Sequence, residues 1–221
     1  MSTTSSLPQY SLTDDQLAIR DLVRQITEER VAPRAAEIDA TGEYPHDLRK
    51  LFGEQGLFGL VIPEEYGGAH TEEGCGTLTL NLAIEEISKA CASSALMLMV
   101  AELSTLSIRL AGSEEQKQRW LPSVATGETS GAFGLSEPAA GSDPGSMITS
   151  AVRDGDEYVI NGSKSWITNA SIADWYLVFA VTDREQGKNG ISAFVVEADR
   201  PGFEVVSLEH KLGIKGSPTG T

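Results

Sequence analysis

The pattern of the chain changes at residues 128–143, which have the sequence ETSGAFGLSEPAAGSD. Before this stretch, apolar residues recur with the spacing of about 3.6 residues that is typical of helices. After it, they recur with the spacing of about two that is typical of strands, and the turn residues change accordingly. The switch near Gly127 predicts a boundary between an all-helical domain, residues 1–127, and a β domain, residues 128–221.

Upstream of this boundary the sequence predicts a bundle of helices. Residues 13–16, Thr-Asp-Asp-Gln, and residues 113–116, Ser-Glu-Glu-Gln, have the form of a capping box, in which side chains satisfy free amides at a helix start. Two later segments are apolar over much of the helix circumference, which is typical of buried helices. The predicted helices cover residues 13–39, 46–55, 73–90, 93–110 and a segment from Ser113 past Trp120, with a loop at 61–68.

Downstream of the boundary, short apolar runs separated by turn residues predict strands. Asp154-Gly155 and Asn161-Gly162 are strong signals for tight turns, so we expect the strands to pair antiparallel. Short strands at this spacing predict a barrel or sandwich, which makes the whole chain an α+β multidomain protein. The predicted strands are residues 131–135, 148–153, 157–160, 175–181, 191–196 and 203–206.

Composition and spacing exclude several classes of function. Lys and Arg number 17 and Asp and Glu 32, a formal net charge of −15, so we expect no sequence-independent binding to nucleic acid or anionic lipid. We find no secretory pattern in the first ten residues and no apolar run near the roughly 20 residues of a membrane span, so we expect a cytoplasmic protein. Cys75, Cys91 and the three histidines, His46, His70 and His210, match no metal-site spacing. We expect the cysteines to be reduced packing residues and no metal to be bound.

The stretch 133–143 is a candidate binding loop. It leaves a predicted strand, turns at Glu137-Pro138 and exposes amides among small residues, with hydroxyl groups at Ser136 and Ser142. Amides and hydroxyls grouped in this way bind an anion or the polar edge of a heterocycle without a positive side chain. This property suits an acidic protein that has to hold phosphates. An ordinary loop rich in Gly, Ser and Asp is the alternative interpretation.

The segment 165–169, Ser-Trp-Ile-Thr-Asn, is a second candidate. On an extended strand, residues two apart face the same way, so Trp166 and Thr168 would present an aromatic plane and a hydroxyl on one surface. A flat ring cofactor needs that combination. The alternative is a core tryptophan, whose ring N–H needs only a buried acceptor.

Together the two segments resemble the signatures of the acyl-CoA dehydrogenase family. The first signature is Leu135-Ser136-Glu137-Pro138 followed by Gly141-Ser142-Asp143, the second is Trp166-Ile167-Thr168-Asn169, and their separation also fits. The resemblance is highly specific and extends over nearly the whole chain. It includes the segments Pro63-Glu64-Glu65-Tyr66-Gly67-Gly68, Ile84-Glu85-Glu86-Ile87-Ser88 and Lys211-Leu212-Gly213-Ile214-Lys215.

The resemblance implies a site for FAD. It places Ser136 and its neighbouring amides near the pyrimidine edge of the flavin. It places Ser142 close to a phosphate or to the pantetheine arm of the thioester, so Ser142 is also the candidate substrate-binding residue. Trp166 would flank the isoalloxazine ring, and the Thr168 hydroxyl would hydrogen-bond near flavin N5, which accepts the hydride. The cofactor-binding residues implied in this way are Phe133, Leu135, Ser136, Gly141, Ser142, Trp166, Ile167 and Thr168.

The resemblance also implies an activity. Family members remove the α-proton of an acyl-CoA thioester with a glutamate while the β-hydrogen moves as hydride to N5, giving a trans-2-enoyl-CoA in fatty-acid β-oxidation. Electrons then pass to electron-transferring flavoprotein, and the family is commonly a homotetramer. In this family the base comes from a C-terminal helical domain or a helix near the domain junction, so we expect it beyond Thr221. We therefore expect the chain to be a fragment that is inactive alone.

Two alternatives stay open, and no carboxylate of this chain takes the role of the base. The same scaffold supports acyl-CoA oxidases that use oxygen. A protein that ended at Thr221 would instead be a non-catalytic flavin or acyl-CoA binding module. We expect Glu137, before a proline at a turn, to be a structural hydrogen-bonding group, Asp143 to cap a turn, and Glu85-Glu86 to pair with a buried basic residue.

Overall fold

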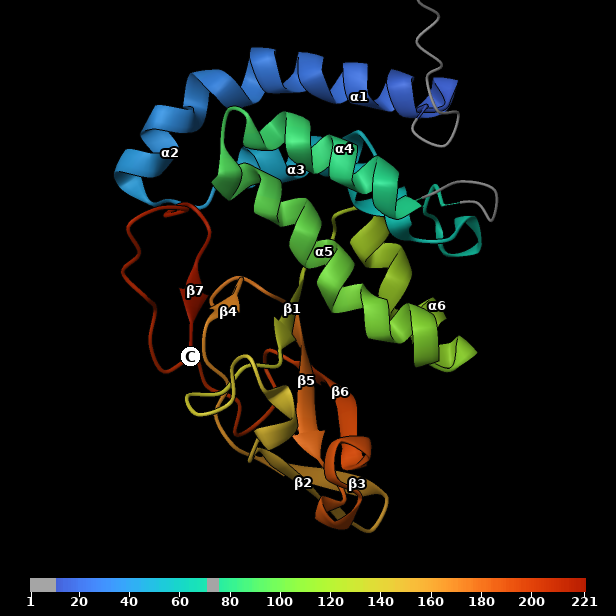
Figure 1. The fold of residues 1–221 in the computed structure, drawn as a ribbon, viewed down its shortest axis with the longest axis vertical. Coiled ribbons are helices and arrows are strands. Elements are labelled where there is room, and N and C mark those ends of the chain that lie inside the picture. Colours follow the sequence, from blue (N-terminus) through green and yellow to red (C-terminus); the bar gives the residue numbers. More distant parts are fainter. Residues whose placement is uncertain (1–10, 71–75) are drawn as a thin grey trace, which may run out of the picture.

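The structure, a computed structural model, describes residues 11–70 and 76–221. Helices form one end of it and strands the other, with α5 and α6 next to the sheet (Figure 1). A helical part followed by a β part confirms the predicted fold class. The helix predicted over residues 73–90 corresponds to α4, and its first residues lie outside the described ones. The helices are α1 (Asp14–Ile26), α2 (Ala35–Thr41), α3 (His46–Glu54), α4 (Gly76–Ser88), α5 (Ala92–Ala111) and α6 (Glu114–Ala125).

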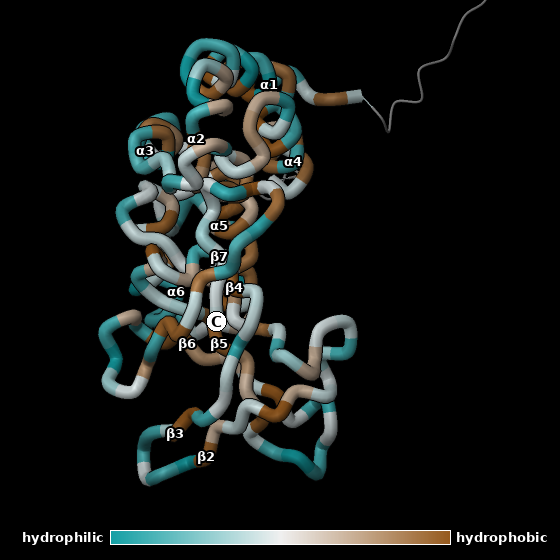
Figure 2. Tube along the Cα trace, turned by 90° about the vertical axis from the view of Figure 1, so that its left-hand side faces the viewer, coloured by the Kyte–Doolittle hydropathy of each residue, from teal (hydrophilic) through white to brown (hydrophobic). Residues whose placement is uncertain are grey.

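The first predicted helix, residues 13–39, is longer and less regular than its pattern indicates. Hydrophobic and hydrophilic residues alternate along α1 (Figure 2), which then passes into a π-turn at Thr27–Val31 and a 3-10 turn at Ala32–Arg34. Pro33 lacks an N–H, so a regular ladder of hydrogen bonds cannot continue through it. The chain resumes as α2 and stops at Gly42, whose φ of 70° is the left-handed conformation that favours glycine.

The helix α5 is the centre of the helical part and packs against α4, α6 and β1. By length and composition it is apolar enough to cross a membrane, so the expectation that no apolar run reaches that length was wrong. Core helices pass the same test, and half of the most apolar window of α5 is buried. Its charged residues Glu102 and Arg109 form an ion pair with each other, and Arg109 also donates to the Val61 carbonyl at 2.9 Å. Burial in the protein therefore accounts for the composition of α5.

The residue before α5, Cys91, is a buried free thiol whose sulfur accepts a hydrogen bond from the Ser94 hydroxyl at 3.3 Å. This contact agrees with the packing role predicted for it. Cys75 lies outside the described residues.

Both predicted capping boxes are present. The hydroxyls of Thr13 and Ser113 each accept the backbone N–H of the glutamine three residues later at 3.2 Å. The side chains of Gln16 and Gln116 return the contact at 3.1 and 2.8 Å, because their carbonyl oxygens accept the N–H of the capping residue. The starts of α1 and α6 are therefore fixed by local sequence.

Replacing Ser113 by alanine should lower the free energy of unfolding by about 1 kcal/mol. The substitution leaves the Gln116 N–H without its acceptor while removing almost no apolar contact. Urea unfolding followed by far-ultraviolet circular dichroism measures the change. Ser171→Ala, at an exposed serine outside any helix, is the control and should be nearly neutral. Equal losses in the two variants would contradict the capping role.

The sheet is mixed and open. β6 pairs along one edge of β5 over its whole length, β1 pairs with residues 175–178 of β5 and β2 with Val181 on the opposite edge, and β3 follows β2. Two pairs, β2 with β3 and β5 with β6, are antiparallel as predicted, but β1 and β2 both run parallel to β5. The sheet does not close into a barrel. The strands are β1 (Gly131–Gly134), β2 (Ser150–Asp154), β3 (Glu157–Asn161), β4 (Ile167–Thr168), β5 (Trp175–Val181), β6 (Ile191–Glu197) and β7 (Thr219–Gly220).

The parallel pairs have a simple reason. A tight turn such as Asp154-Gly155 fixes the direction of the two strands that it joins, but it says nothing about strands that meet across long connections. The strand predicted at 203–206 is also wrong. Residues 203–206 are not a strand: the N–H of Val206 bonds the Thr221 carbonyl at 2.8 Å, and the pairing with the end of the chain continues outside the predicted range, at Ser207 and Glu209.

The helical and β parts share one hydrophobic core. Trp175 of β5 is 1% exposed, and its ring centre lies 5.5 Å from that of Trp120 in α6. A Cβ at Gly131 would lie 2.6 Å from Ser104 of α5 and 2.7 Å from the Trp175 ring. The backbone of β1 can therefore approach α5 only because residue 131 is glycine.

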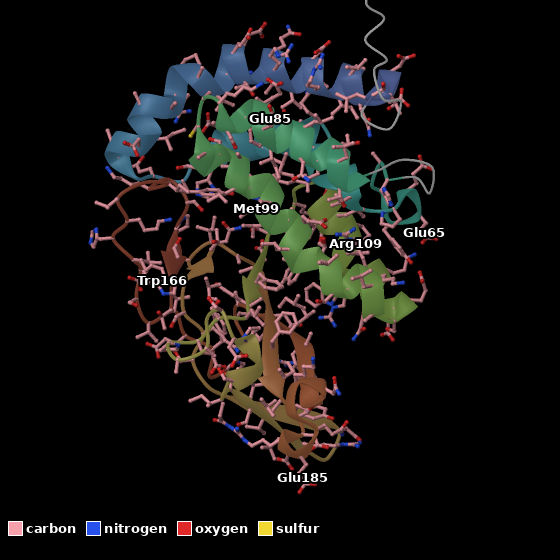
Figure 3. The ribbon with its side chains drawn as sticks, in the orientation of Figure 1. Glu65, Glu85, Met99, Arg109, Trp166 and Glu185 are labelled. Carbon is pink, nitrogen blue, oxygen red and sulfur yellow. The ribbon has the colours of Figure 1, made fainter. Side chains whose placement is uncertain are left out.

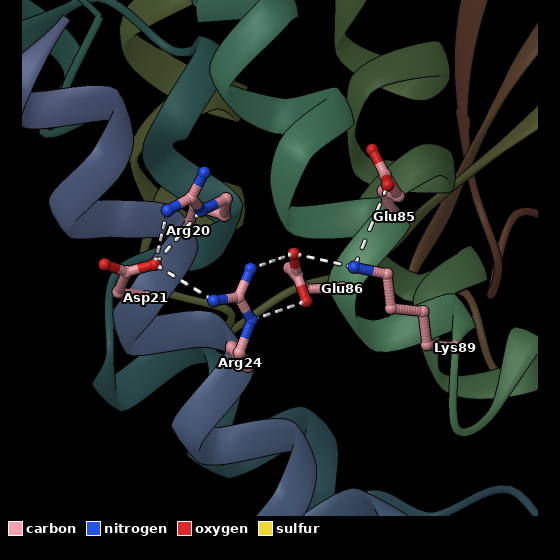
Figure 4. Close-up of polar contacts among 6 residues, drawn as sticks. All are labelled: Arg20, Asp21, Arg24, Glu85, Glu86 and Lys89. Atoms are coloured by element: carbon pink, nitrogen blue, oxygen red, sulfur yellow. Dashed lines mark hydrogen bonds and ion pairs between the residues drawn. The ribbon is translucent and has the colours of Figure 1, made fainter. Parts of the chain in front are cut away.

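One ion-pair network joins α1 to α4 (Figure 4). The buried carboxylate of Glu86 accepts hydrogen bonds from Arg24 at 2.9 and 3.3 Å and from Lys89 at 2.8 Å. The Arg24 guanidinium lowers the pKa of Glu86, and Lys89 adds to this against the opposing effect of burial. The predicted pairing is confirmed for Glu86, whose carboxylate is buried, but the side chains of its partners Arg24 and Lys89 are not buried. For Glu85 the buried pair is wrong: Glu85 is exposed and contacts Lys89 only at the surface, at 3.8 Å, because successive residues of a helix face different sides.

Candidate functional site

The loop that follows β1 makes a tight turn at the predicted first motif. Glu137 and Ala140 exchange backbone hydrogen bonds of 3.0 and 3.1 Å across it. Gly141 and Ser142, just beyond, are exposed. The turn therefore presents small residues to the surface while Glu137 itself is buried, with 4% of the residue exposed.

The second motif is not the extended strand that the sequence indicated. Trp166 has φ of 64° and Asn169 has φ of 66°, and only Ile167 and Thr168 between them are extended, as β4. The chain turns at both ends because β4 pairs with β7 for two residues only. The Trp166 ring is nevertheless 65% exposed and lies beside β4 and β7 (Figure 3), so it is not a core tryptophan.

The two motifs are in direct contact. The backbone N–H of Ser165 donates to the carbonyl of Ser136 at 2.9 Å. The ammonium of Lys164 donates to the Leu135 carbonyl at 3.0 Å and to the Glu137 carboxylate at 2.7 Å. Two segments about 30 residues apart in sequence are thereby held side by side.

Three predicted hydroxyl groups are available to a ligand. Ser142 is exposed, and Ser136 and Thr168 are partly exposed. Within residues 11–70 and 76–221, we find no hydrogen bond to any of these three hydroxyls. Together with the exposed Trp166 side chain, they offer an aromatic surface and polar groups of the kind that bind a flat heterocyclic ligand.

The side chains of three other predicted residues pack within the protein. The Phe133 ring packs against Phe179 with centres 5.2 Å apart, and Leu135 packs on the small cluster that contains Met147. Ile167 is 6% exposed. Phe133 and Leu135 are partly exposed, whereas the Ile167 side chain is buried.

The carboxylate of Glu137 is fully engaged. It accepts the N–H of Ile148 at 2.7 Å and that of Thr149 at 3.0 Å, besides the ammonium of Lys164. Burial raises the pKa of Glu137, but the N–H of Ile148, the Lys164 ammonium and the contacts to Thr149 together outweigh it and lower the pKa to about 2. Glu137 is therefore ionised and structural at neutral pH, as predicted.

Asp143 behaves differently from the prediction. It begins the 3-10 turn Pro144–Ser146, but its backbone carbonyl, and not its carboxylate, accepts the N–H and the hydroxyl of Ser146 at 3.2 and 2.8 Å. The carboxylate is exposed because the hydroxyl of Ser146 already completes the turn.

Sequence reasoning missed two lysines. Lys164 could have been found from the need of a buried Glu137 for a cation. Lys211 donates to the Ser217 carbonyl at 2.6 Å and to the Thr219 hydroxyl at 2.8 Å. Since Thr219 is the cross-strand partner of Thr168, Lys211 supports β4 from behind. Only the return of the chain onto β4 could reveal that contact.

A separate open concavity lies elsewhere. It has a volume of about 790 Å³ and lies between α3 and the segments that lead into β1 and β5, with Arg49, Ser130 and Asp174 in its wall. It is not lined by any of the predicted site residues. In the part of the chain that the structure describes, we find no group of His, Cys, Asp or Glu that could hold a metal ion.

A helical part, an open mixed sheet and two polar motifs in contact with each other define the architecture of the chain. Residues 13–128 match the family model described as "Acyl-CoA dehydrogenase, N-terminal domain", and residues 132–221 match "Acyl-CoA dehydrogenase, middle domain". The chain belongs to the acyl-CoA dehydrogenase family and carries these two domains.

Known relatives agree with this assignment. A short-chain specific acyl-CoA dehydrogenase from Clostridium acetobutylicum is 44% identical over 211 residues, which are 95% of this chain and 55% of the relative. Butyryl-CoA dehydrogenase from Megasphaera elsdenii superposes with a TM-score of 0.89 at 38% identity over 96% of this chain and 55% of that chain. A glutaryl-CoA dehydrogenase from Mycobacterium smegmatis, solved in complex with FADH2, gives 0.84 at 37% identity over 95% and 52%. The chain thus spans about half the length of these relatives.

Proposed function

We propose that the protein is a FAD-dependent acyl-CoA dehydrogenase and that this chain supplies its flavin cradle. The observation that carries the proposal is the backbone contact between the two motifs, in which Trp166 is exposed and Ser136 and Thr168 are partly exposed. Family membership supports the choice of FAD over another flat cofactor.

Each of these residues is proposed to contact a different part of the cofactor or substrate. Trp166 would lie against the isoalloxazine ring, Thr168 would donate to its central nitrogen edge, and Ser136 with its neighbouring amides would hold the pyrimidine edge. Ser142 and the exposed amides around Gly141 would contact phosphate or the pantetheine arm of the substrate. When bound, FAD supplies a hydride acceptor for the β-hydrogen of an acyl-CoA thioester, whose oxidation gives a trans-2-enoyl-CoA.

The proton acceptor is proposed to lie outside this chain. Glu137 is a buried carboxylate within the first motif, and its oxygens are already engaged by Ile148, Thr149 and Lys164. A general base needs a free lone pair directed at the substrate and a pKa near the working pH. With a pKa of about 2, Glu137 does not meet this requirement.

The partner and assembly that we propose are those that the family resemblance implies, and the compartment is the one expected from the sequence. We propose electron-transferring flavoprotein as the electron acceptor, a homo-oligomer as the assembly and the cytoplasm as the compartment. Reduced enzyme mixed with either electron-transferring flavoprotein or air-saturated buffer tests the first of these. Rapid reoxidation by oxygen alone would identify an oxidase and overturn the proposed dehydrogenase.

Replacing Thr168 by alanine should leave the fold intact and weaken FAD binding about 5- to 10-fold, the value of one hydrogen bond of about 1 kcal/mol. Quenching of flavin fluorescence on titration with apoprotein measures the dissociation constant. Thr41→Ala, which removes a hydroxyl from the end of α2, is the matched control and should not change it. Identical FAD affinity in the Thr168 variant would remove Thr168 from the site.

A further inference from the structure

One buried ion pair connects the two motifs of the site. The side chains of Glu137 and Lys164 are 2% and 10% exposed, and their charged atoms are 2.7 Å apart. Lys164 precedes Trp166 by two residues, and Glu137 follows Ser136 directly. The pair is therefore close in the chain to Trp166 and Ser136, the residues proposed to present the aromatic face and the polar edge.

The pair fixes three segments of chain at once. Lys164 reaches the Leu135 carbonyl at 3.0 Å, while the same carboxylate of Glu137 accepts the N–H groups of Ile148 and Thr149 at 2.7 and 3.0 Å. Next to this cluster, the Ser165 N–H bonds the Ser136 carbonyl at 2.9 Å. A shift of Lys164 would thus move the start of the Trp166 turn relative to Ser136.

Trp166 depends on such support for its position. Its φ of 64° is unfavourable for a bulky side chain, so the surrounding contacts have to hold the turn in place. Its ring is 65% exposed and gains little from packing within this chain. The hydrogen bonds on either side of it are what define its direction.

We propose that Glu137 and Lys164 are positioning residues that set the spacing between the Trp166 turn and the Ser136 loop, and through that spacing the affinity for FAD. This inference rests on the proposed function. Neither residue needs to touch the cofactor. At metal sites, partners that orient the binding groups cost about 10- to 100-fold in affinity when removed, and we expect a loss of at least about tenfold here.

The chain contains a matched control. Glu86 is likewise a buried carboxylate, with its side chain 5% exposed and cations at 2.9 and 2.8 Å (Figure 4). It joins α1 to α4 and contacts no predicted flavin residue. Arg24→Met and Lys164→Met each deprive a buried carboxylate of a cation, so both should destabilise the fold. Only the second should change FAD binding.

The test is FAD affinity and urea unfolding of the apoprotein, measured on intact protein for the wild type, Lys164→Met, Arg24→Met and the double variant Glu137→Gln/Lys164→Met. Lys164→Met should raise the dissociation constant at least about tenfold, and Arg24→Met less than about twofold. The double variant has no unpaired buried charge, so it should regain stability, while its FAD affinity stays low because the link between the motifs is still absent.

The outcomes separate the two proposals. If the wild type binds no FAD, both the proposed function and this inference are wrong. If the wild type binds FAD and Lys164→Met binds it equally well, the positioning role is wrong while the function stands. A double variant that regains affinity together with stability would also overturn the inference, since the pair would then act on stability alone.

Discussion

Replacing Trp175 by alanine is expected to lower the free energy of unfolding by about 3–5 kcal/mol, the usual cost of truncating a fully buried aromatic residue. Trp175 is 1% exposed and lies where β5 meets the helical part, against Trp120 and the backbone of Gly131. Its ring N–H has no hydrogen-bond partner among the described residues, so the loss comes from packing alone. Urea unfolding of the apoprotein measures it.

A second tryptophan provides the control. Trp166 is 65% exposed, so Trp166→Ala should change the stability of the apoprotein by no more than about 0.5 kcal/mol. The same substitution should weaken FAD binding, whereas that effect is not expected of Trp175→Ala once the variant is folded. Equal losses of unfolding free energy in the two variants would mean that packing of Trp175 between the helical and β parts does not stabilise the core.

Replacing Glu137 by glutamine is expected to lower stability at pH 7 by about 3 kcal/mol. The value follows from a pKa of about 2 in the folded protein against 4.5 for the free group, at 1.36 kcal/mol for each pKa unit. A carboxyl whose folded pKa is lowered stabilises the protein above its unfolded pKa, and this contribution disappears as the pH falls through the folded pKa. The difference between wild type and variant should therefore shrink between about pH 4.5 and pH 2.

The ammonium of Lys164 sets a limit on this stabilisation. Burial lowers the pKa of Lys164, and its attraction to Glu137 only partly compensates. The Glu137 carboxylate is also stabilised by the N–H groups of Ile148 and Thr149. We therefore expect most of the pH-dependent stabilisation to come from Glu137. Other acids such as Glu86 titrate in both proteins and cancel in the comparison. A stability difference that does not depend on pH would contradict the ionic role of Glu137.

Local patterns determined the helical part of the fold well. The two capping boxes and the stops at Gly42 and Gly112 involve contacts over three or four residues, and the structure contains them all. The relative direction of the strands was harder to predict from the sequence. The Asp154-Gly155 turn fixed the antiparallel pair β2–β3, but the parallel pairing of β1 with β5 joins residues more than 40 positions apart.

In the candidate site, too, local features could be predicted from the sequence and long-range contacts could not. The chemistry at Ser136, Trp166 and Thr168 is visible in the residue types, and the structural role of Glu137 follows from its place before a proline. The left-handed turn at Trp166 was not predicted, because it depends on β4 pairing with β7 some 50 residues later in the chain.

By itself, therefore, the sequence of this protein determined its helices, the change to strands near residue 130, its family and the residue types of the two motifs proposed to bind flavin. These depend on neighbours within a few positions or on the motifs themselves. Only the tertiary structure decided the strand order, the shared core at Trp175 and the link from Lys164 to Glu137. Each of these joins distant segments, whose meeting depends on the free energy of packing the whole chain and not on any local preference.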